Sequence, residues 1–258
     1  MVRVAGMSKE ERYHKNVLYV RPEEQAKIKE TTIFLAGVGL GSMIVETALR
    51  LGFESFVLVD GDEVETSNLN RQNYSAQDTG KSKVQATKEH LLSINPNAHI
   101  VCHHLFLNPD NIAELLTGAD IAINAIDFDV AETAFVFDEI CQQMKIPVIH
   151  PLNLGWAGAA YLVTPESEQF SDMARGEGRF ELTLIKNIID QHGKGSKLDL
   201  SWFEGFLDDY KRCSDQITPP QLAVGSALAS AIVTNLLFSL VNGIAARTYP
   251  AIHFLSTR

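Results

Sequence analysis

Asp60 and Asp127 are carboxylates that each follow a short apolar run, Phe56–Val59 and Ile121–Ile126. Runs of this length are too short for a helix and predict buried β-strands. Because ligands of doubly wound sheets bind at the carboxyl ends of the strands, we expect both side chains at one edge of a sheet. There Asp60 can accept hydrogen bonds from ribose hydroxyls. Asp127 can hold Mg²⁺ on the phosphates of a nucleotide.

A glycine-rich turn precedes Asp60 by about 20 residues, the spacing of a nucleotide-binding βαβ unit. Gly37, Gly39 and Gly41 lie between an apolar run, Ile33–Ala36, and a helical pattern that ends near Leu51. Such glycines let backbone N–H groups approach a phosphate, and the helix N-terminus adds partial positive charge. The alternative is a turn that only packs the helix on the strand. The carboxylate at the end of the next strand favours the nucleotide site.

Basic residues lie between the two carboxylates. Lys81 and Lys83 open a helix that we expect to run to about Ile94, where their charge opposes the helix dipole. This mismatch suggests that they bind an anion. Arg71 stands in a polar loop beside acidic residues. By itself, an arginine in such a loop is often only a salt-bridge partner.

These alternating elements predict an α/β fold: a Rossmann-like, doubly wound and mainly parallel sheet with helices on both faces. A C-terminal extension follows it. We expect four parts: an N-terminal helical arm (1–30), the nucleotide-binding core (31–165), an insertion that forms the substrate surface (166–218), and a C-terminal helix and strand that complete the core (219–258).

The composition limits the class of protein. The 258 residues are 45% apolar, which is ample for a core, and the net charge of -10 argues against a nucleic-acid partner. Cys102, Cys141 and Cys213 form no CxxC pair, so neither zinc nor a disulfide framework is expected. The first residues contain no apolar stretch typical of a secretion signal, which favours a cytoplasmic location.

Residues 222–241 form the longest apolar stretch and could be mistaken for a membrane span. Ser226, Ser230, Thr234 and Ser239 interrupt it, and no basic flank marks a cytosolic end. We therefore expect a helix buried against the sheet, and no contact with a membrane.

The order of the polar residues is more specific than the glycine pattern. Asp60-x-Asp62 is followed by Ser67-Asn68-Leu69-Asn70-Arg71-Gln72, then by Gly80-x-x-Lys83 and Ile94-Asn95-Pro96. In this the chain resembles the ThiF/MoeB superfamily of ATP-dependent adenylyltransferases, which includes the ubiquitin-activating enzymes. The resemblance runs from about Arg12 to the end.

The resemblance implies roles for these residues. The ribose of ATP would bind Asp60, the triphosphate Arg71 and Lys83, and Mg²⁺ would work with Asp127. The nucleotide-binding residues are then expected to be Gly37, Gly39, Gly41, Asp60, Asp62, Asn68, Arg71, Gln72 and Lys83. The implied nucleotidyltransferase reaction activates the C-terminal carboxylate of a ubiquitin-like or sulfur-carrier protein that ends in glycine, or of a peptide, as an acyl-adenylate.

The chain departs from the family pattern at several places. Its glycine turn is one residue shorter, and the paired CxxC zinc motifs are absent. Lys15 stands where the family has an arginine that reaches the ATP of the partner subunit in a homodimer. Lysine keeps the charge but loses the bidentate fork. Asn124 replaces the first aspartate of the family's Asp-x-x-Asp strand end, whereas Asp127 is kept.

Cys213 stands seven residues before Pro220, where some members of the family carry a cysteine that forms a covalent sulfur or thioester link with the carrier. Its neighbours Lys211 and Arg212 would favour the reactive thiolate. The alternative is a partly buried cysteine without chemistry, since several members adenylate without using one.

Three other functions compete with adenylyltransferase activity. A non-catalytic scaffold, like the inactive half of a heterodimeric activating enzyme, would explain the shortened turn and Lys15. A tRNA-modifying dehydratase of the same superfamily would need a basic surface, which the acidic composition disfavours. A nicotinamide-dependent oxidoreductase shares the glycine turn but would not require Arg71 and Lys83.

Overall fold

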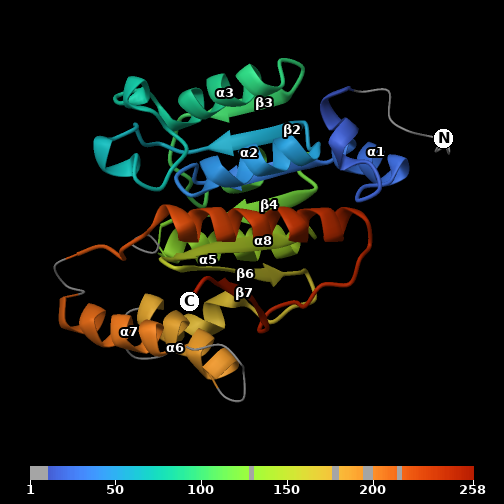
Figure 1. The fold of residues 1–258 in the computed structure, drawn as a ribbon. Helices are drawn as coiled ribbons and strands as arrows, with labels where there is room; N and C mark the ends of the chain where they lie inside the picture. Colours follow the sequence, from blue (N-terminus) through green and yellow to red (C-terminus); the bar gives the residue numbers. More distant parts are fainter. Residues whose placement is uncertain (1–10, 128–130, 176–179, 194–199, 214–216) are drawn as a thin grey trace.

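The computed structural model describes residues 11–127, 131–175, 180–193, 200–213 and 217–258. A seven-stranded sheet with the order β3-β2-β1-β4-β5-β6-β7 runs through it (Figure 1). β1 to β5 are parallel, and β6 and β7 add an antiparallel edge. The strands are β1 (Thr32–Ala36), β2 (Ser55–Val59), β3 (His99–His103), β4 (Ile121–Asn124), β5 (Val148–Leu154), β6 (Ala157–Val163) and β7 (Ile252–Ser256).

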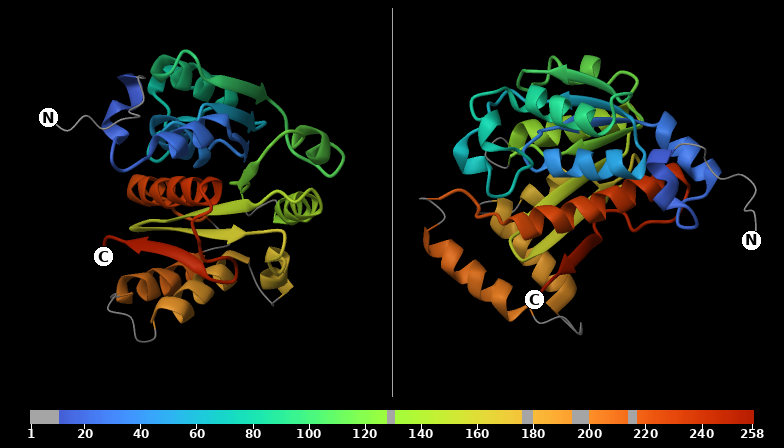
Figure 2. Two further views of the ribbon diagram at one scale, coloured as in Figure 1. Left: turned by 90° about the vertical axis from the view of Figure 1, so that its right-hand side faces the viewer. Right: turned by 45° about the horizontal axis from the view of Figure 1, so that its top comes forward.

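Helices cover both faces of the sheet (Figures 1 and 2). They are α1 (Pro22–Glu30), α2 (Gly41–Leu51), α3 (Lys83–Ile94), α4 (Ile112–Leu115), α5 (Ala131–Gln143), α6 (Phe180–Gly193), α7 (Ser201–Cys213) and α8 (Ala223–Val241). The shorter 3₁₀ turns are η1 (Glu11–Asn16), η2 (Thr66–Asn68), η3 (Ala76–Asp78) and η5 (Phe170–Arg175). The Rossmann-like, mainly parallel fold expected from the sequence is confirmed. The first ten residues of the predicted arm lie outside the described residues.

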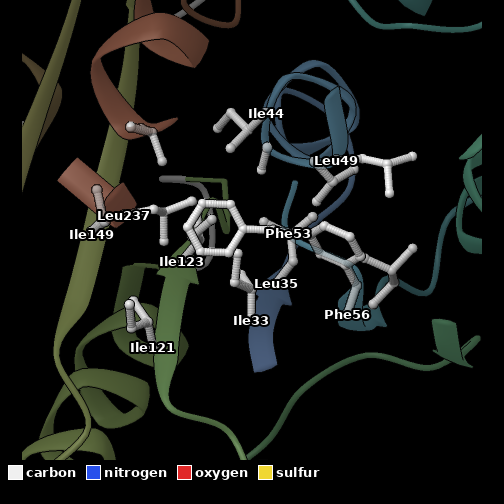
Figure 3. Packing of buried hydrophobic residues seen from close by; sticks show 14 of the residues in the cluster. Ile33, Leu35, Ile44, Leu49, Phe53, Phe56, Ile121, Ile123, Ile149 and Leu237 are labelled. Carbon is white, nitrogen blue, oxygen red and sulfur yellow. The ribbon is translucent and has the colours of Figure 1, made fainter. Parts of the chain in front are cut away.

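The alternation of side chains along each strand divides the core into two clusters. In β1, Ile33 and Leu35 face α2, α3 and α8, whereas Phe34 and Ala36 face α4 to α7. Successive side chains of a strand point to opposite faces, so a strand with apolar residues at every position is buried on both sides. Figure 3 shows the first cluster, in which Phe53 lies toward Ile123 of β4, and Phe56 of β2 lies beneath Leu49 of α2.

The helix α8 is the apolar stretch that resembles a membrane span. It is the one helix found in the described part of the chain that is long and apolar enough to cross a membrane. It packs on α2, β5 and β6. A Cβ atom on Gly158 of β6 would lie 2.3 Å from the backbone nitrogen of Ala229, so strand and helix backbones touch there. The small residues of α8 permit this close approach, as expected for a helix buried against the sheet.

The N-terminal elements, η1 and α1, lie near the amino ends of the strands (Figure 1). The loop that follows β2 lies at the opposite ends of the strands. The Tyr13 hydroxyl donates to Glu54 Oε1 at 2.9 Å, and Asn16 Nδ2 donates to the Leu51 carbonyl at 2.8 Å. Glu54 precedes β2 and Leu51 ends α2, so both contacts lie where these elements meet, away from the carboxyl ends of the strands.

Candidate active site

A large cleft opens at the carboxyl ends of β1, β2 and β4, with a volume of about 1180 Å³. It extends past β5 to α6 and α7. Among the predicted site residues, the following line it: Gly37, Gly39, Asp60, Asp62, Asn68, Arg71, Gln72, Lys83 and Asp127. Segments far apart in the sequence therefore meet in one cleft, as expected for a doubly wound sheet.

The glycine turn has the geometry of a phosphate cradle. Gly37 has a φ of +87°, and a Cβ there would lie 2.5 Å from the Ala125 carbonyl oxygen. A Cβ on Gly41, which does not line the cleft, would lie 2.7 Å from Leu35. Within the described residues, no hydrogen-bond acceptor is found for the backbone N–H groups of Gly39, Leu40 and Gly41. These donors at the start of α2 are available to an anion.

Asp60 is held at the floor of the cleft by two backbone donors. Its Oδ2 accepts from the Val38 N–H and its Oδ1 from the Asp62 N–H, both at 2.8 Å. Burial raises the pKa of Asp60 above its usual range, and the nearby charge of Lys83 opposes that rise. Each carboxylate oxygen keeps a second lone pair, so the group can still accept ribose hydroxyls.

Lys83 is buried against Asp62, with Nζ 2.7 Å from Oδ2. The Lys83 N–H also bonds to the Asp62 carbonyl at 3.0 Å, which fixes the start of α3 beside the Asp62 loop. Lys81 is different: its ammonium pairs with Asp78 and Glu89, and it does not line the cleft. The prediction that both lysines serve an anion is therefore wrong for Lys81, whose charge is paired within the chain.

Arg71 is oriented by a residue that the sequence did not single out. Its Nε donates to Gln221 Oε1 at 2.8 Å, and Nη1 donates to the Ser67 carbonyl and to Asn70 Oδ1 at 2.9 Å. Among the described residues no acceptor is found for Nη2, so two of the five donors remain for a ligand. Gln221 lies just before α8, which couples the predicted phosphate-binding loop to the C-terminal helix.

Asn68 and Gln72 also line the cleft, and both are close to Arg71 in the sequence. Asn68 is buried, and its Oδ1 accepts from the Glu65 N–H at 3.0 Å. Gln72 lies against Gly39, since a Cβ on that glycine would be 3.0 Å from Gln72 Nε2. The buried Oε1 of Gln72 receives no hydrogen bond from the residues described. A donor on a bound ligand would satisfy it.

Asp127 is exposed and lies three residues beyond the end of β4. The described residues contain no group of three or more histidine, cysteine or acidic side chains that could hold a metal ion by themselves. Mg²⁺ on a nucleotide does not need such a group, because one or two carboxylates together with the phosphates suffice. Asp127 therefore fits the metal role only together with a bound nucleotide.

Asn124 belongs to a buried network beneath the cleft. Its Nδ2 donates to Asp138 Oδ1 and to the Ala134 carbonyl, both at 3.0 Å. Asp138 Oδ2 lies 2.9 Å from His150 Nε2, and the His150 ring stacks on Phe170 at 4.2 Å. An amide at position 124 supplies the donor that Asp138 needs, which explains the departure from the family's aspartate.

Replacing Asn124 with aspartate is expected to lower the free energy of unfolding by about 2–4 kcal/mol. The new carboxylate would face Asp138 Oδ1 without a donor between them. Urea denaturation at pH 7 measures the effect, which should shrink in acid, where a protonated carboxyl can donate. Asn97→Asp adds the same charge at an exposed position and should change stability by less than about 0.5 kcal/mol. Equal effects for both variants would contradict the role of the network.

Two predicted residues lie away from the cleft. Lys15 is exposed on η1, which lies near the amino ends of the strands, whereas the cleft lies at their carboxyl ends. Cys213 ends α7, and its Sγ donates to the Asp209 carbonyl at 3.4 Å. Its basic neighbours pair with carboxylates instead, Lys211 with Asp208 and Arg212 with Asp209. The catalytic role of Cys213 stays a prediction.

Other cleft residues carried no signal in the sequence. Phe106 follows β3 and is 69% exposed, and its ring covers Gly61, where a Cβ would meet ring carbons at 2.7 Å. An exposed aromatic beside Asp60 offers a face for a nucleotide base. The aromatic residues of α6 and α7 also line the cleft, but their spacing resembles that of ordinary core residues.

Comparison with known protein families identifies the family of this chain. The ThiF family model matches residues 13–250. The chain belongs to the ThiF family. Proteins that are named for different activities are similar to this chain in sequence. Over 162 residues it is 31% identical to the sulfur carrier protein ThiS adenylyltransferase of Bacillus subtilis, covering 60% of this chain and 48% of that protein. Over 171 residues it is 30% identical to the tRNA threonylcarbamoyladenosine dehydratase of Haemophilus influenzae, covering 65% and 63%.

A solved structure shares the fold of this ThiF-family chain. The crystal structure of E. coli MccB with AMPCPP and MccA superposes with a TM-score of 0.69 at 18% identity, covering 98% of this chain and 72% of MccB. The chain spans about half the length of the curated relatives it matches, from 28% to 63%. The family is thus established over most of the chain.

Proposed function

We propose that this protein is an ATP-dependent adenylyltransferase that activates the C-terminal carboxylate of a small ubiquitin-like or sulfur-carrier protein, or of a peptide. The observation that carries the proposal is the meeting of Asp60, Arg71, Lys83 and Asp127 in one cleft beside the glycine turn. A nicotinamide site would need the turn and Asp60 but neither cation.

The proposed reaction joins a carboxylate oxygen of the substrate to the α-phosphorus of ATP. The bond between the α-phosphorus and the bridging oxygen breaks, and pyrophosphate leaves. A carboxylate is already ionised at neutral pH, so no general base is required. The demand on the protein is to neutralise phosphate charge as it shifts toward the leaving group. Lys83 and Nη2 of Arg71 are the groups suited to this.

Asp127 is the proposed Mg²⁺ ligand. Mg²⁺ would supply charge neutralisation at the phosphates, and the exposed carboxylate beyond β4 would hold it there. The free N–H groups at the start of α2 would bind phosphate oxygens, and Asp60 would bind the ribose. Asp60 and the N–H groups at the start of α2 line or border the same cleft as Asp127.

The remaining expectations are also proposals. A homodimer would let Lys15 reach the cleft of the partner subunit, since within one chain it lies near the amino ends of the strands, away from the cleft. Cys213 would take part only after adenylation. The four-part division of the chain, with the substrate surface at 166–218, and the cytoplasmic location likewise stay predictions.

A second candidate function is favoured by one comparison. The dehydratase of Haemophilus influenzae is as similar to this chain as the ThiS adenylyltransferase. The net charge of -10 disfavours a tRNA substrate, because binding of phosphate backbones needs a basic surface. A tRNA affinity that falls steeply with salt would support this candidate. A scaffold role would require that the chain alone catalyse no ATP–pyrophosphate exchange.

ATP–pyrophosphate exchange tests the proposed function. The purified chain, ATP, Mg²⁺ and labelled pyrophosphate are incubated with candidate carriers that end in glycine, and with peptides. We expect labelled ATP only when a suitable carboxylate is present, and the same exchange from the Cys213→Ala variant. No binding of ATP with Mg²⁺ under any of these conditions would refute the proposal. Any exchange by the chain would exclude the scaffold role.

A further inference from the structure

The cleft is larger than a nucleotide site requires. Its volume of about 1180 Å³ exceeds the roughly 300–1,000 Å³ of most small-molecule pockets. The nucleotide-binding residues occupy the end near β1 and β2. The other end is an aromatic lobe, lined by Phe135, Phe180, Trp202, Phe203, Phe206 and Tyr210 from α5, α6 and α7.

The aromatic rings of the lobe form two packed groups. Phe135 and Phe180 meet edge to face, with ring centroids 5.4 Å apart. Along α7, Trp202 and Phe203 lie 5.0 Å apart, and Phe206 stacks on Tyr210 at 5.8 Å. These contacts fix the rings in place, so the lobe is a preformed apolar wall.

The helix α7 presents two apolar stripes rather than one. Phe203, Leu207 and Tyr210 are buried in the core. Trp202 and Phe206 are only partly buried, and with Gly205 they form a second stripe at helical spacing, every member of which lines the cleft. A surface helix ordinarily carries polar residues on its second stripe. Aromatic surface facing the cleft is stabilised when a ligand covers it.

Gly205 leaves a notch between the two aromatic residues. A Cβ built there meets nothing within 4 Å. In addition, Nε1 of Trp202 is buried and has no acceptor among the residues described. The wall therefore combines apolar faces, free space and an unused hydrogen-bond donor, which suits a bulky side chain next to a backbone carbonyl.

We propose that the carboxylate substrate carries a large apolar side chain on its last residue, and that this side chain binds in the aromatic lobe. This inference rests on the proposed function, because the lobe and the nucleotide end belong to one cleft. A substrate that ends in two glycines has no side chain to fill the lobe. The reacting carboxylate would lie between the lobe and the phosphates.

Tryptophan fluorescence tests the proposal without ATP. The two tryptophans, Trp156 and Trp202, both line the cleft, so a Trp156→Phe variant keeps Trp202 as the sole reporter. Peptides of one sequence that end in Gly-Gly, Gly-Ala or Gly-Phe are titrated, with N-acetyl-phenylalanine to represent a free acid. We expect the peptide that ends in phenylalanine to bind at least about tenfold more tightly than the one that ends in Gly-Gly.

Filling the notch provides the matched test. Gly205→Phe should weaken binding of the phenylalanine peptide at least about tenfold and leave ATP binding unchanged, whereas Gly205→Ala should keep both. Circular dichroism and thermal unfolding check that the variants fold. Equal affinity for the three peptides, or no effect of Gly205→Phe, would overturn the inference. If the peptides are distinguished but exchange never occurs, the lobe stands and the adenylation proposal fails.

Discussion

Replacing Lys83 with alanine is expected to lower the rate of ATP–pyrophosphate exchange by about 100- to 1,000-fold. Lys83 is buried at the cleft with its ammonium beside Asp62. In the proposed reaction it would neutralise the charge that develops on the leaving phosphates. The free energy of unfolding should fall by only about 1 kcal/mol, because the Asp62 carboxylate is half exposed and water can solvate it.

The pH dependence separates this role from a structural one. Burial raises the pKa of Asp60, and the charge of Lys83 lowers it. Without Lys83, the pKa of Asp60 rises further, so its carboxylate becomes protonated at a higher pH. The acid limb of nucleotide binding should therefore move to higher pH in Lys83→Ala, as measured by titration of ATP at several pH values.

Lys81→Ala is the matched control for this variant. Lys81 lies two residues away, is exposed, and pairs with Asp78 and Glu89 outside the cleft. Its loss should leave exchange within about twofold of the wild type and the acid limb in place. A similar loss in both variants would mean that the local charge, and not the position of Lys83, decides the rate.

Replacing Asp127 with alanine is expected to reduce exchange about 1,000-fold in the presence of Mg²⁺. Without its carboxylate, the edge of the sheet beyond β4 lacks the proposed metal ligand. Binding of ATP in EDTA should be unchanged, because the ribose and phosphate donors remain. The measurements are exchange as a function of Mg²⁺ concentration and calorimetric titration of ATP with and without the metal.

Two further variants test the proposed metal role of Asp127. Asp127→Asn keeps an oxygen ligand but no charge, so it should need more Mg²⁺ and regain part of the rate. Asp110→Ala removes an exposed carboxylate from the loop after β3, away from the lining of the cleft, and should behave as the wild type. Equal weakening of metal-free ATP binding by Asp127→Ala would argue against a metal role.

The sequence predicted the sheet, and it predicted many of the residues that line the cleft near β1 and β2, because both depend on local patterns. The runs Ile33–Ala36 and Phe56–Val59 are apolar at every position, which only a strand buried on two faces requires. The positions of Gly37 and Asp60 follow from the chain geometry of the βαβ unit. Tertiary contacts were not needed to place any of them.

The remaining features depend on contacts between distant segments. Gln221 holds Arg71 across about 150 residues of sequence, and no pattern in either segment marks the pair. The apolar stripe of Trp202 and Phe206 resembles a core stripe until the cleft is seen. Lys81 and Lys83 carry the same local signal, and only the fold directs one into the cleft and the other to Asp78. The amide at position 124 is explained by its hydrogen bond to Asp138, which no local sequence pattern indicates.

The close contact between Gly158 and Ala229 has a consequence for synthesis of the chain. The helix α8 is apolar enough to be taken for a membrane anchor, and most of its surroundings in the folded protein, α1, α2, β5 and β6, precede it in the sequence, whereas β7 follows it. During translation, most of the surface that shelters α8 is therefore synthesised before the helix leaves the ribosome. A chain with a disordered sheet would present α8 to chaperones, or to other chains, as an exposed apolar segment. Mutations that enlarge Gly158 should therefore reduce soluble yield more than they reduce catalysis.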